Sequence, residues 1–171
     1  MYNLGYACIN MGLSNQPKSK RVTTNRSMIR RTFLSKGLPY ASELALQNCL
    51  DLERIIQWNQ DNDIKFYRMS SDILPWHSEY EIEELPDFRA IEASLKRAGS
   101  LAQVYGQRIT THPGPYNKLT SPRPHVVTNT ITDLENHGRI FDLMGLPRSP
   151  YAKINIHVGA HYNDKQMAIG N

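Results

Sequence analysis

The feature that most constrains the fold is a repeated alternation of short β-rich segments with amphipathic helical segments. Four β-rich segments end in polar residues, and a helical pattern follows each of the first three. The predicted strands are residues 3–9, 64–69, 107–111 and 153–158. Strands that alternate with helices at this spacing are typical of a parallel sheet with right-handed crossovers. The chain is therefore predicted to be an α/β protein.

Apolar residues recur at helical spacing in the three segments between these strands. The first helix is expected to begin near Ser42, a residue type that favours the N-cap, and to end near residues 59–62. The second should open at Asp87 and close at Gly106, and Gly145 should close the third. The expected core positions are Ala45, Cys49, Leu52 and Ile56, then Phe88, Ile91, Leu95, Ala98, Leu101 and Tyr105, then Val127, Ile131, Leu134, Phe141 and Met144.

Two architectures fit this alternation, an open doubly wound sheet and a (β/α)8 barrel of the TIM type. No GxGxxG or GxxxxGK[ST] motif follows any predicted strand, which argues against a nucleotide-binding open sheet. A closed barrel usually needs roughly 250 residues. The chain has 171 residues, so a barrel would be represented by about its first four βα units, a half barrel.

Composition narrows the class further. Hydrophobic residues make up 40% of the chain and charged residues 21%, which favours one ordered domain over residues 1–171. No apolar run approaches a membrane span, and the start, MYNLGYACIN, lacks the layout of a signal peptide, so a cytoplasmic location is expected. Cys8 and Cys49 lie in apolar patterns without zinc-ligand spacing, which favours buried thiols.

The net charge of +4 is mild, but basic residues crowd into one early segment. This basic segment contains Lys18, Lys20, Arg21, Arg26, Arg30 and Arg31. A clustered patch of this kind supplies sequence-independent affinity for nucleic-acid phosphates, although an ordinary solvated loop has the same composition.

Polar residues follow the predicted strands at their carboxyl ends, where parallel α/β folds place their functional sites. Asn10 follows the first strand and the run Ser70, Ser71, Asp72 follows the second. His112 follows the third strand, and His157 lies near the end of the fourth. Equivalent ends of neighbouring strands lie about 4.8 Å apart, so two imidazoles there could bind one metal or adjacent metals. His125, His137 and His161 are weaker candidates, because their positions fit solvent-facing, capping or loop roles.

Five segments of the chain resemble the UV-damage endonuclease family, in the family's order and spacing. They are LGYACIN at 4–10, TTNR at 23–26, NCLDLERIIQWNQDNDIKFYRMSSDILP at 48–75, GQRITTHPGPYN at 106–117 and INIHVGAHYNDK at 154–165. The resemblance implies a (β/α)8 barrel of the same broad type as AP endonuclease IV. It also implies a cluster of divalent metals, often manganese, that serves to cut double-stranded DNA on the 5′ side of UV photoproducts.

The same resemblance assigns roles to individual residues. His112 and His157 match metal-ligand positions. Tyr6 and Asn10 match residues that line the damage-binding side, although Tyr6 also fits ordinary strand packing. The TTNR motif adds Asn25 and Arg26 as expected DNA contacts. Tyr116 matches an aromatic residue that probes the distorted duplex, where weakened stacking makes insertion of a side chain less costly.

Two positions depart from the family pattern. Pro115 stands where a glutamine is common, so a polar probe is replaced by an apolar one that can still act as a wedge beside Tyr116. Glu79 stands where the family has a ligating histidine, four residues after Pro75. Either His77 or Glu79 could supply that ligand, since carboxylate oxygen suits manganese, and His77 is slightly favoured.

The resemblance also implies that later strands carry further ligands, which this sequence does not contain. We therefore expect a truncated chain with an incomplete metal site and doubtful activity of its own. A half barrel would expose the first and fourth strands as unpaired edges, which favours self-association. Two alternatives stay open: a non-catalytic DNA-binding or assembly fragment, and an AP endonuclease or sugar isomerase with the same barrel.

Overall fold

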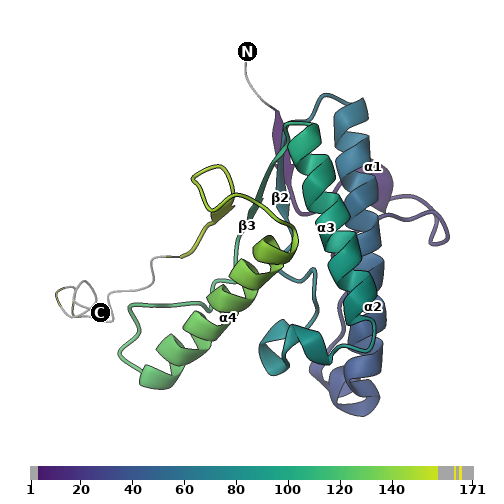
Figure 1. Cartoon of the computed structure of the whole chain (residues 1–171). Helices are drawn as coiled ribbons and strands as arrows, with labels where there is room; N and C mark the ends of the chain where they lie inside the picture. Colours follow the sequence, from purple (N-terminus) through teal and green to yellow (C-terminus); the bar gives the residue numbers. More distant parts are fainter. Residues whose placement is uncertain (1–3, 158–163, 165, 167–171) are drawn as a thin grey trace.

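The computed structural model describes residues 4–157, 164 and 166, which form one four-stranded sheet with helices packed beside it (Figure 1). The strands are β1 (Gly5–Ala7), β2 (Phe66–Met69), β3 (Arg108–Thr111) and β4 (Lys153–Ile154). They pair in the order β1-β2-β3-β4, and every neighbouring pair is parallel. The predicted α/β class is confirmed. Each observed strand lies within its predicted segment. Residue 3 of the first predicted segment and residue 158 of the fourth lie outside the described residues.

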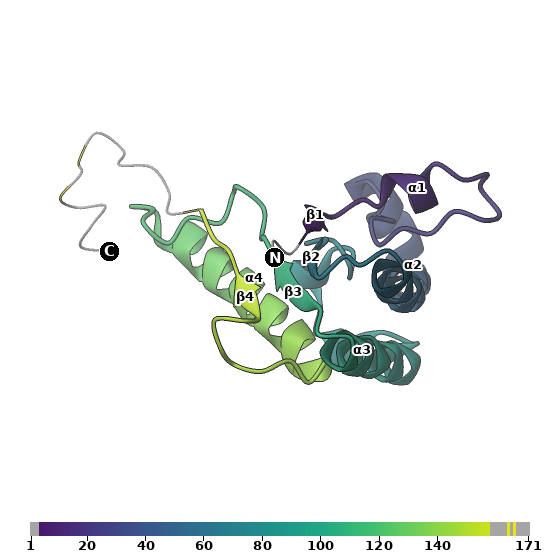
Figure 2. The same ribbon diagram turned by 90° about the horizontal axis from the view of Figure 1, so that it is seen from above.

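Four α-helices and two short 3-10 helices connect the strands. They are α1 (Met11–Ser14), α2 (Arg30–Asp61), η1 (His77–Glu79), η2 (Ile82–Glu84), α3 (Phe88–Val104) and α4 (Pro124–Leu143). The helices α2 and α3 lie side by side along one side of β1–β3, and α4 follows beyond α3 (Figure 2). Helix α4 also contacts η1, which lies in the loop that follows β2.

The predicted start of the first long helix at Ser42 is wrong. Helix α2 already begins at Arg30, and Gly37, with a φ of 63°, interrupts it before Pro39 opens the second part. Glycine tolerates this left-handed geometry and proline suits a first helical turn, so the pair joins two helical pieces across a kink. Ser42 is buried and serves a different purpose. Its hydroxyl donates to Asp87 Oδ2 and accepts from the Asp87 N–H, both over 2.8 Å, which ties α2 to the start of α3.

The core between the helices and the sheet uses the predicted positions of the first two helices, but fewer of those of the third. Val127 and Leu134 are only half-buried and are not among the described residues that pack against the core. The α2 positions from Ala45 to Ile56 and the α3 positions Ile91, Leu95 and Ala98 are fully buried. Ile131 is 45% exposed, which makes its predicted core role wrong. Helix α4 instead buries the face that carries Thr130, His137 and Phe141, and part of that face is polar. Cys49 is buried and Cys8 is half-buried, and both are free thiols.

The two end strands of the sheet are β1 and β4, as the half-barrel expectation requires. In the part of the chain that the structure describes, each pairs with one neighbour, so each has one side without a strand partner. Self-association through these edges stays a prediction. No helix among the described residues is long and apolar enough to cross a membrane.

Candidate functional site

The sheet brings His112 and His157 together, as their strand-end positions predict. His112 directly follows β3, and His157 follows the neighbouring parallel strand β4. A backbone hydrogen bond from Asn155 N to Thr111 O, of 2.9 Å, continues the pairing beyond β4. The two imidazole centroids are 4.5 Å apart, with their planes at 68°. This spacing allows ring nitrogens of both residues to approach one cation, while their role as metal ligands stays a prediction.

The surroundings of His112 favour its neutral form. Burial, followed by the neighbouring His157 and the positive charge of Arg68, lowers the pKa of His112 below its ordinary value. Neutral imidazole is the form that binds metals. Arg68 lies on β2, and its Nε is buried without a hydrogen-bond partner in the described structure. A cationic group therefore lies beside the histidine pair.

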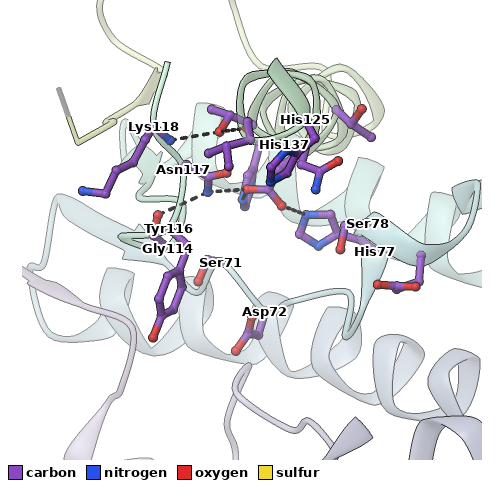
Figure 3. A pocket seen from close by; sticks show the side chains of 16 residues that line it. Ser71, Asp72, His77, Ser78, Gly114, Tyr116, Asn117, Lys118, His125 and His137 are labelled. Atoms are coloured by element: carbon purple, nitrogen blue, oxygen red, sulfur yellow. Dashed lines mark hydrogen bonds and ion pairs between the residues drawn. The ribbon is translucent and has the colours of Figure 1, made fainter. Parts of the chain in front are cut away.

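A separate cavity of about 870 Å³ lies between the loop after β2, the loop after β3 and helix α4 (Figure 3). His77 and Glu79, the two candidates for the metal ligand expected in the loop after β2, both line this cavity. Tyr116 lines it as well. Neither His112 nor His157 is among the described residues that line this cavity. The structure thus divides the predicted metal ligands between two places.

Inside the cavity, His77 meets two residues of α4, Asp133 and His137. The Nε2 of His77 is 2.9 Å from Asp133 Oδ1, and the Nε2 of His137 is 3.7 Å from Asp133 Oδ2. One donor atom from each of the three residues lies within 4.8 Å of the others, an arrangement that could hold a metal ion. Figure 3 shows His77 and His137 turned to the same part of the cavity from two different elements. We refer to these three residues as the cavity triad.

Electrostatics in the cavity triad keep the aspartate charged and one histidine neutral. Burial alone would raise the pKa of Asp133, but the hydrogen bond and charge of His77, together with His137 and Asn117, hold it below its ordinary value. Burial and the nearby His77 lower the pKa of His137 to about 4, against the opposing effect of Asp133. A carboxylate and a neutral imidazole are the protonation states that a metal requires.

Two members of the cavity triad were not identified from the sequence. His137 was assigned to a solvent-facing or capping role, yet it is 1% exposed, and Asp133 was not singled out. Their spacing of four residues on one helix face is a signal that could have identified them, because i and i+4 side chains lie one above the other. The third member could not be found this way, since His77 comes from a loop far away in the sequence.

The loop that carries His77 is held by contacts with the segment before α2. Trp76, the residue before η1, has a φ of 62°, an uncommon conformation for a bulky side chain. Its indole N–H donates to the Met28 carbonyl over 2.9 Å, and its ring stacks on Phe33 at 5.4 Å with an angle of 8°. These contacts stabilise the left-handed turn that directs His77 toward α4.

Tyr6 and Asn10 have internal partners. The Tyr6 hydroxyl donates to Asn59 Oδ1 over 2.7 Å and accepts from Asn10 Nδ2 over 3.0 Å. Asn10 is buried and its Oδ1 accepts from Leu13 N, which caps α1. These bonds support packing roles, and the predicted roles in damage binding remain untested.

Arg26 likewise has its guanidinium engaged inside the molecule. It donates to Asp51 Oδ2 over 2.7 Å, and the Asp51 side chain is only 7% exposed. Asn25 is half-buried beside it, and its side-chain oxygen accepts from Thr24. The other members of the basic segment, Lys18, Lys20, Arg21, Arg30 and Arg31, are exposed. These five residues, more than Arg26, are free to contact phosphate.

Replacing Arg26 with alanine is expected to lower the free energy of unfolding by about 1–3 kcal/mol, because the buried Asp51 carboxylate loses its best partner. Arg54 also contacts Asp51, at 3.1 Å, but is 61% exposed. Its alanine variant is the control and should change stability by less than about 1 kcal/mol. Urea unfolding measures both. Equal small losses for the two variants would contradict a structural role of Arg26.

The remaining predicted residues lie at the surface. Pro115 and Glu79 are exposed, and Tyr116 is 89% exposed at the mouth of the cavity. His125 is exposed in the first turn of α4 and also lines the cavity. His161 lies outside the described residues. Pro115 and Tyr116 thus form an exposed turn after β3, and their role as a wedge stays a prediction.

Comparisons with known proteins identify the family of this chain. The model of the family described as UV-endonuclease UvdE matches residues 2–171. A UV-damage endonuclease of Schizosaccharomyces pombe is 35% identical over 168 residues, which cover 97% of this chain and 27% of that protein. A UV DNA damage endonuclease of Bacillus mycoides is 39% identical over 127 residues, which cover 74% of this chain and 39% of that protein.

A crystal structure of SacUVDE superposes with a TM-score of 0.81 at 26% identity, covering 99% of this chain and 54% of that one. The four parallel strands are consistent with part of a barrel. The chain spans little more than half of this structure and less than half of the two relatives. Since the family model matches nearly every residue, the chain belongs to the UV-endonuclease UvdE family.

Proposed function

We propose that this chain forms part of a metal-dependent DNA repair endonuclease that cuts double-stranded DNA on the 5′ side of UV photoproducts. One observation carries the proposal: two imidazoles from neighbouring strand ends meet edge to face at a centroid distance of 4.5 Å. This is the edge of a parallel sheet where enzymes of this architecture place their chemistry. Membership of the UvdE family supports the same activity.

The residues present fit a divalent cation such as Mn²⁺. His112 and His157 would hold it through ring nitrogens, and the lowered pKa of His112 keeps that residue in its metal-binding form. A bound metal of this kind supplies an activated water and neutralises charge on the leaving oxygen. A further ligand from the loop after β2, His77 or Glu79, is part of the proposal.

Arg68 and the exposed basic residues would position the DNA. Arg68 places a positive charge beside the histidine pair, and this charge would attract a DNA phosphate to it. The exposed basic residues from Lys18 to Arg31 would contact the backbone at a distance from the chemistry and make binding dependent on salt. Lesion recognition would then rest on Pro115 and Tyr116, which project beside the cavity.

The function is tested by nicking of supercoiled plasmid in Mn²⁺, comparing UV-irradiated, abasic and undamaged DNA, with His157→Ala as the inactive control. Nicking restricted to UV-irradiated DNA and lost in the variant supports the proposal. Preference for abasic DNA would indicate an AP endonuclease instead. Salt-dependent DNA binding without metal-dependent nicking would indicate a non-catalytic DNA-binding fragment.

Replacing Tyr116 with alanine is expected to weaken binding to photoproduct DNA by about 5- to 100-fold, since stacking of a base on an aromatic ring contributes about 1–3 kcal/mol. Binding to undamaged duplex should change little, because phosphate contacts dominate there. Fluorescence anisotropy with a labelled duplex, with and without one photoproduct, measures the ratio. Tyr151→Ala, at a tyrosine that is 48% exposed and does not line the cavity, is the control. An unchanged ratio in Tyr116→Ala would rule out the wedge.

A further inference from the structure

The donor atoms of the cavity triad lie close enough together to reach one cation, since one donor atom from each residue lies within 4.8 Å of the others. The Nε2 atoms of His77 and His137 approach different oxygens of the Asp133 carboxylate, at 2.9 Å and 3.7 Å. Zinc binds imidazole nitrogen and carboxylate oxygen at about 2.0–2.1 Å, so neighbouring ligand atoms of a tetrahedral site lie roughly 3.4 Å apart. Modest side-chain movements would bring the two nitrogens and one of the oxygens to this spacing.

The hydrogen bonds of His77 favour a cation at this place. Its Nδ1 is 3.0 Å from the Leu74 carbonyl, which can only accept, so the ring proton belongs on Nδ1. In the neutral ring, Nε2 then directs a lone pair at the Asp133 carboxylate, which is also an acceptor, over 2.9 Å. Two facing acceptors require a positive charge between or beside them, which is either a second proton on His77 or a metal.

Outer contacts orient the donors as they do at metal centres. Asn117 donates to Asp133 Oδ2 over 2.7 Å, and the Leu74 carbonyl fixes the His77 ring. Asn136 of α4 donates to the His77 carbonyl over 2.9 Å, which holds η1 against the helix. The side of the cavity triad away from these contacts opens into the 870 Å³ cavity, so a fourth ligand position is accessible to water or a small anion.

We propose that His77, Asp133 and His137 bind a divalent transition metal of the zinc type, at a site separate from the His112–His157 pair. Two imidazoles and one carboxylate with an open fourth position suit zinc better than a hard cation. The metal cross-links η1 to α4, and His77 then serves as a ligand in the cavity and not at the histidine pair. Glu79 is then the residue of this loop that remains available to the histidine pair.

The test measures binding of Zn²⁺ and Co²⁺ to the 171-residue chain after removal of metal with a chelator. Binding is followed by calorimetry, by the visible absorption of tetrahedral Co²⁺ and by thermal stability. The unsubstituted chain and His112→Ala should bind one equivalent at the cavity triad with equal affinity. Asp133→Asn and His137→Gln should lose at least about 100-fold in affinity for that equivalent. His125→Ala, at the other histidine of the cavity, should retain it.

Unchanged Co²⁺ affinity in Asp133→Asn and His137→Gln, or loss of all binding in His112→Ala, would overturn the proposal. Circular dichroism checks that the variants fold. If neither variant folds, nitrogen NMR of the unsubstituted chain decides. The chain has six histidines, and the ring signals of His112, His125, His157 and His161 are assigned from their alanine variants, so the two remaining signals belong to His77 and His137. Zn²⁺ should shift the signals of His77 and His137, and a shift confined to His112 and His157 would contradict the assignment. The outcome does not depend on nicking activity.

Discussion

Replacing His112 with alanine is expected to lower the affinity of the strand-end site for Mn²⁺ by at least about 100-fold. The pair offers two imidazole nitrogens, and one imidazole alone at the carboxyl ends of the strands does not hold a divalent cation that exchanges rapidly with water. Isothermal titration in an Asp133→Asn background removes the contribution of the cavity triad. Nicking of UV-irradiated plasmid should fall in parallel, since the cation supplies the chemistry.

His125→Ala is the matched control for Mn²⁺ affinity. It removes an imidazole that is exposed at the start of α4, on the cavity side. Its Mn²⁺ affinity should equal that of the parent. A His112→Ala variant that retains the Mn²⁺ affinity of the parent would show that the pair is not the metal site, whatever the nicking result.

Replacing Gly99 with alanine is expected to destabilise the chain by about 3 kcal/mol, which lowers Tm by roughly 6–12 °C. Gly99 is buried in α3, where a Cβ atom would collide with the backbone carbonyl of Met144 at the end of α4. A flexible side chain could move aside, but here the obstacle is main chain. Helix α4 would have to shift as a unit, and the cavity triad that it carries would shift with it.

Gly138→Ala provides the control, since a Cβ atom added there has no neighbour within 4 Å. Position 138 lies inside α4, where alanine is favoured over glycine by roughly 0.5–1 kcal/mol, so this variant should be slightly more stable than the parent. Thermal unfolding followed by circular dichroism compares the two. A Gly99→Ala protein as stable as the parent would mean that α3 and α4 are not packed this closely in solution.

The strands and the histidine pair could be predicted from the sequence because both depend on local pattern and on one general rule. Each β-rich segment is short and bounded by polar residues, and the carboxyl ends of parallel strands meet at one edge. His112 and His157 therefore come together whatever the loops do. The buried faces of α2 and α3 follow from apolar spacing in the same way.

The complete cavity triad could not be predicted, because Asp133 and His137 share a local i,i+4 spacing but His77 joins them only through a tertiary contact. Ile131, an expected core residue of the same helix, is 45% exposed, whereas His137 is buried. Which face of α4 is buried depends on how the helix packs against α3 and η1. Arg26 illustrates the same limit. Its basic character suggested DNA, yet its partner Asp51 lies 25 residues further along the chain.

The left-handed turn at Trp76 has a consequence for how this enzyme family can diverge. The Phe33 ring stacks on the indole, whereas the Met28 contact is made by a backbone carbonyl that any residue at position 28 retains. A substitution of Phe33 would therefore loosen the indole, let the backbone return to an ordinary conformation and withdraw the imidazole of His77 from α4. The position of His77 can thus change through a residue outside the cavity triad, and selection on the triad alone cannot preserve it.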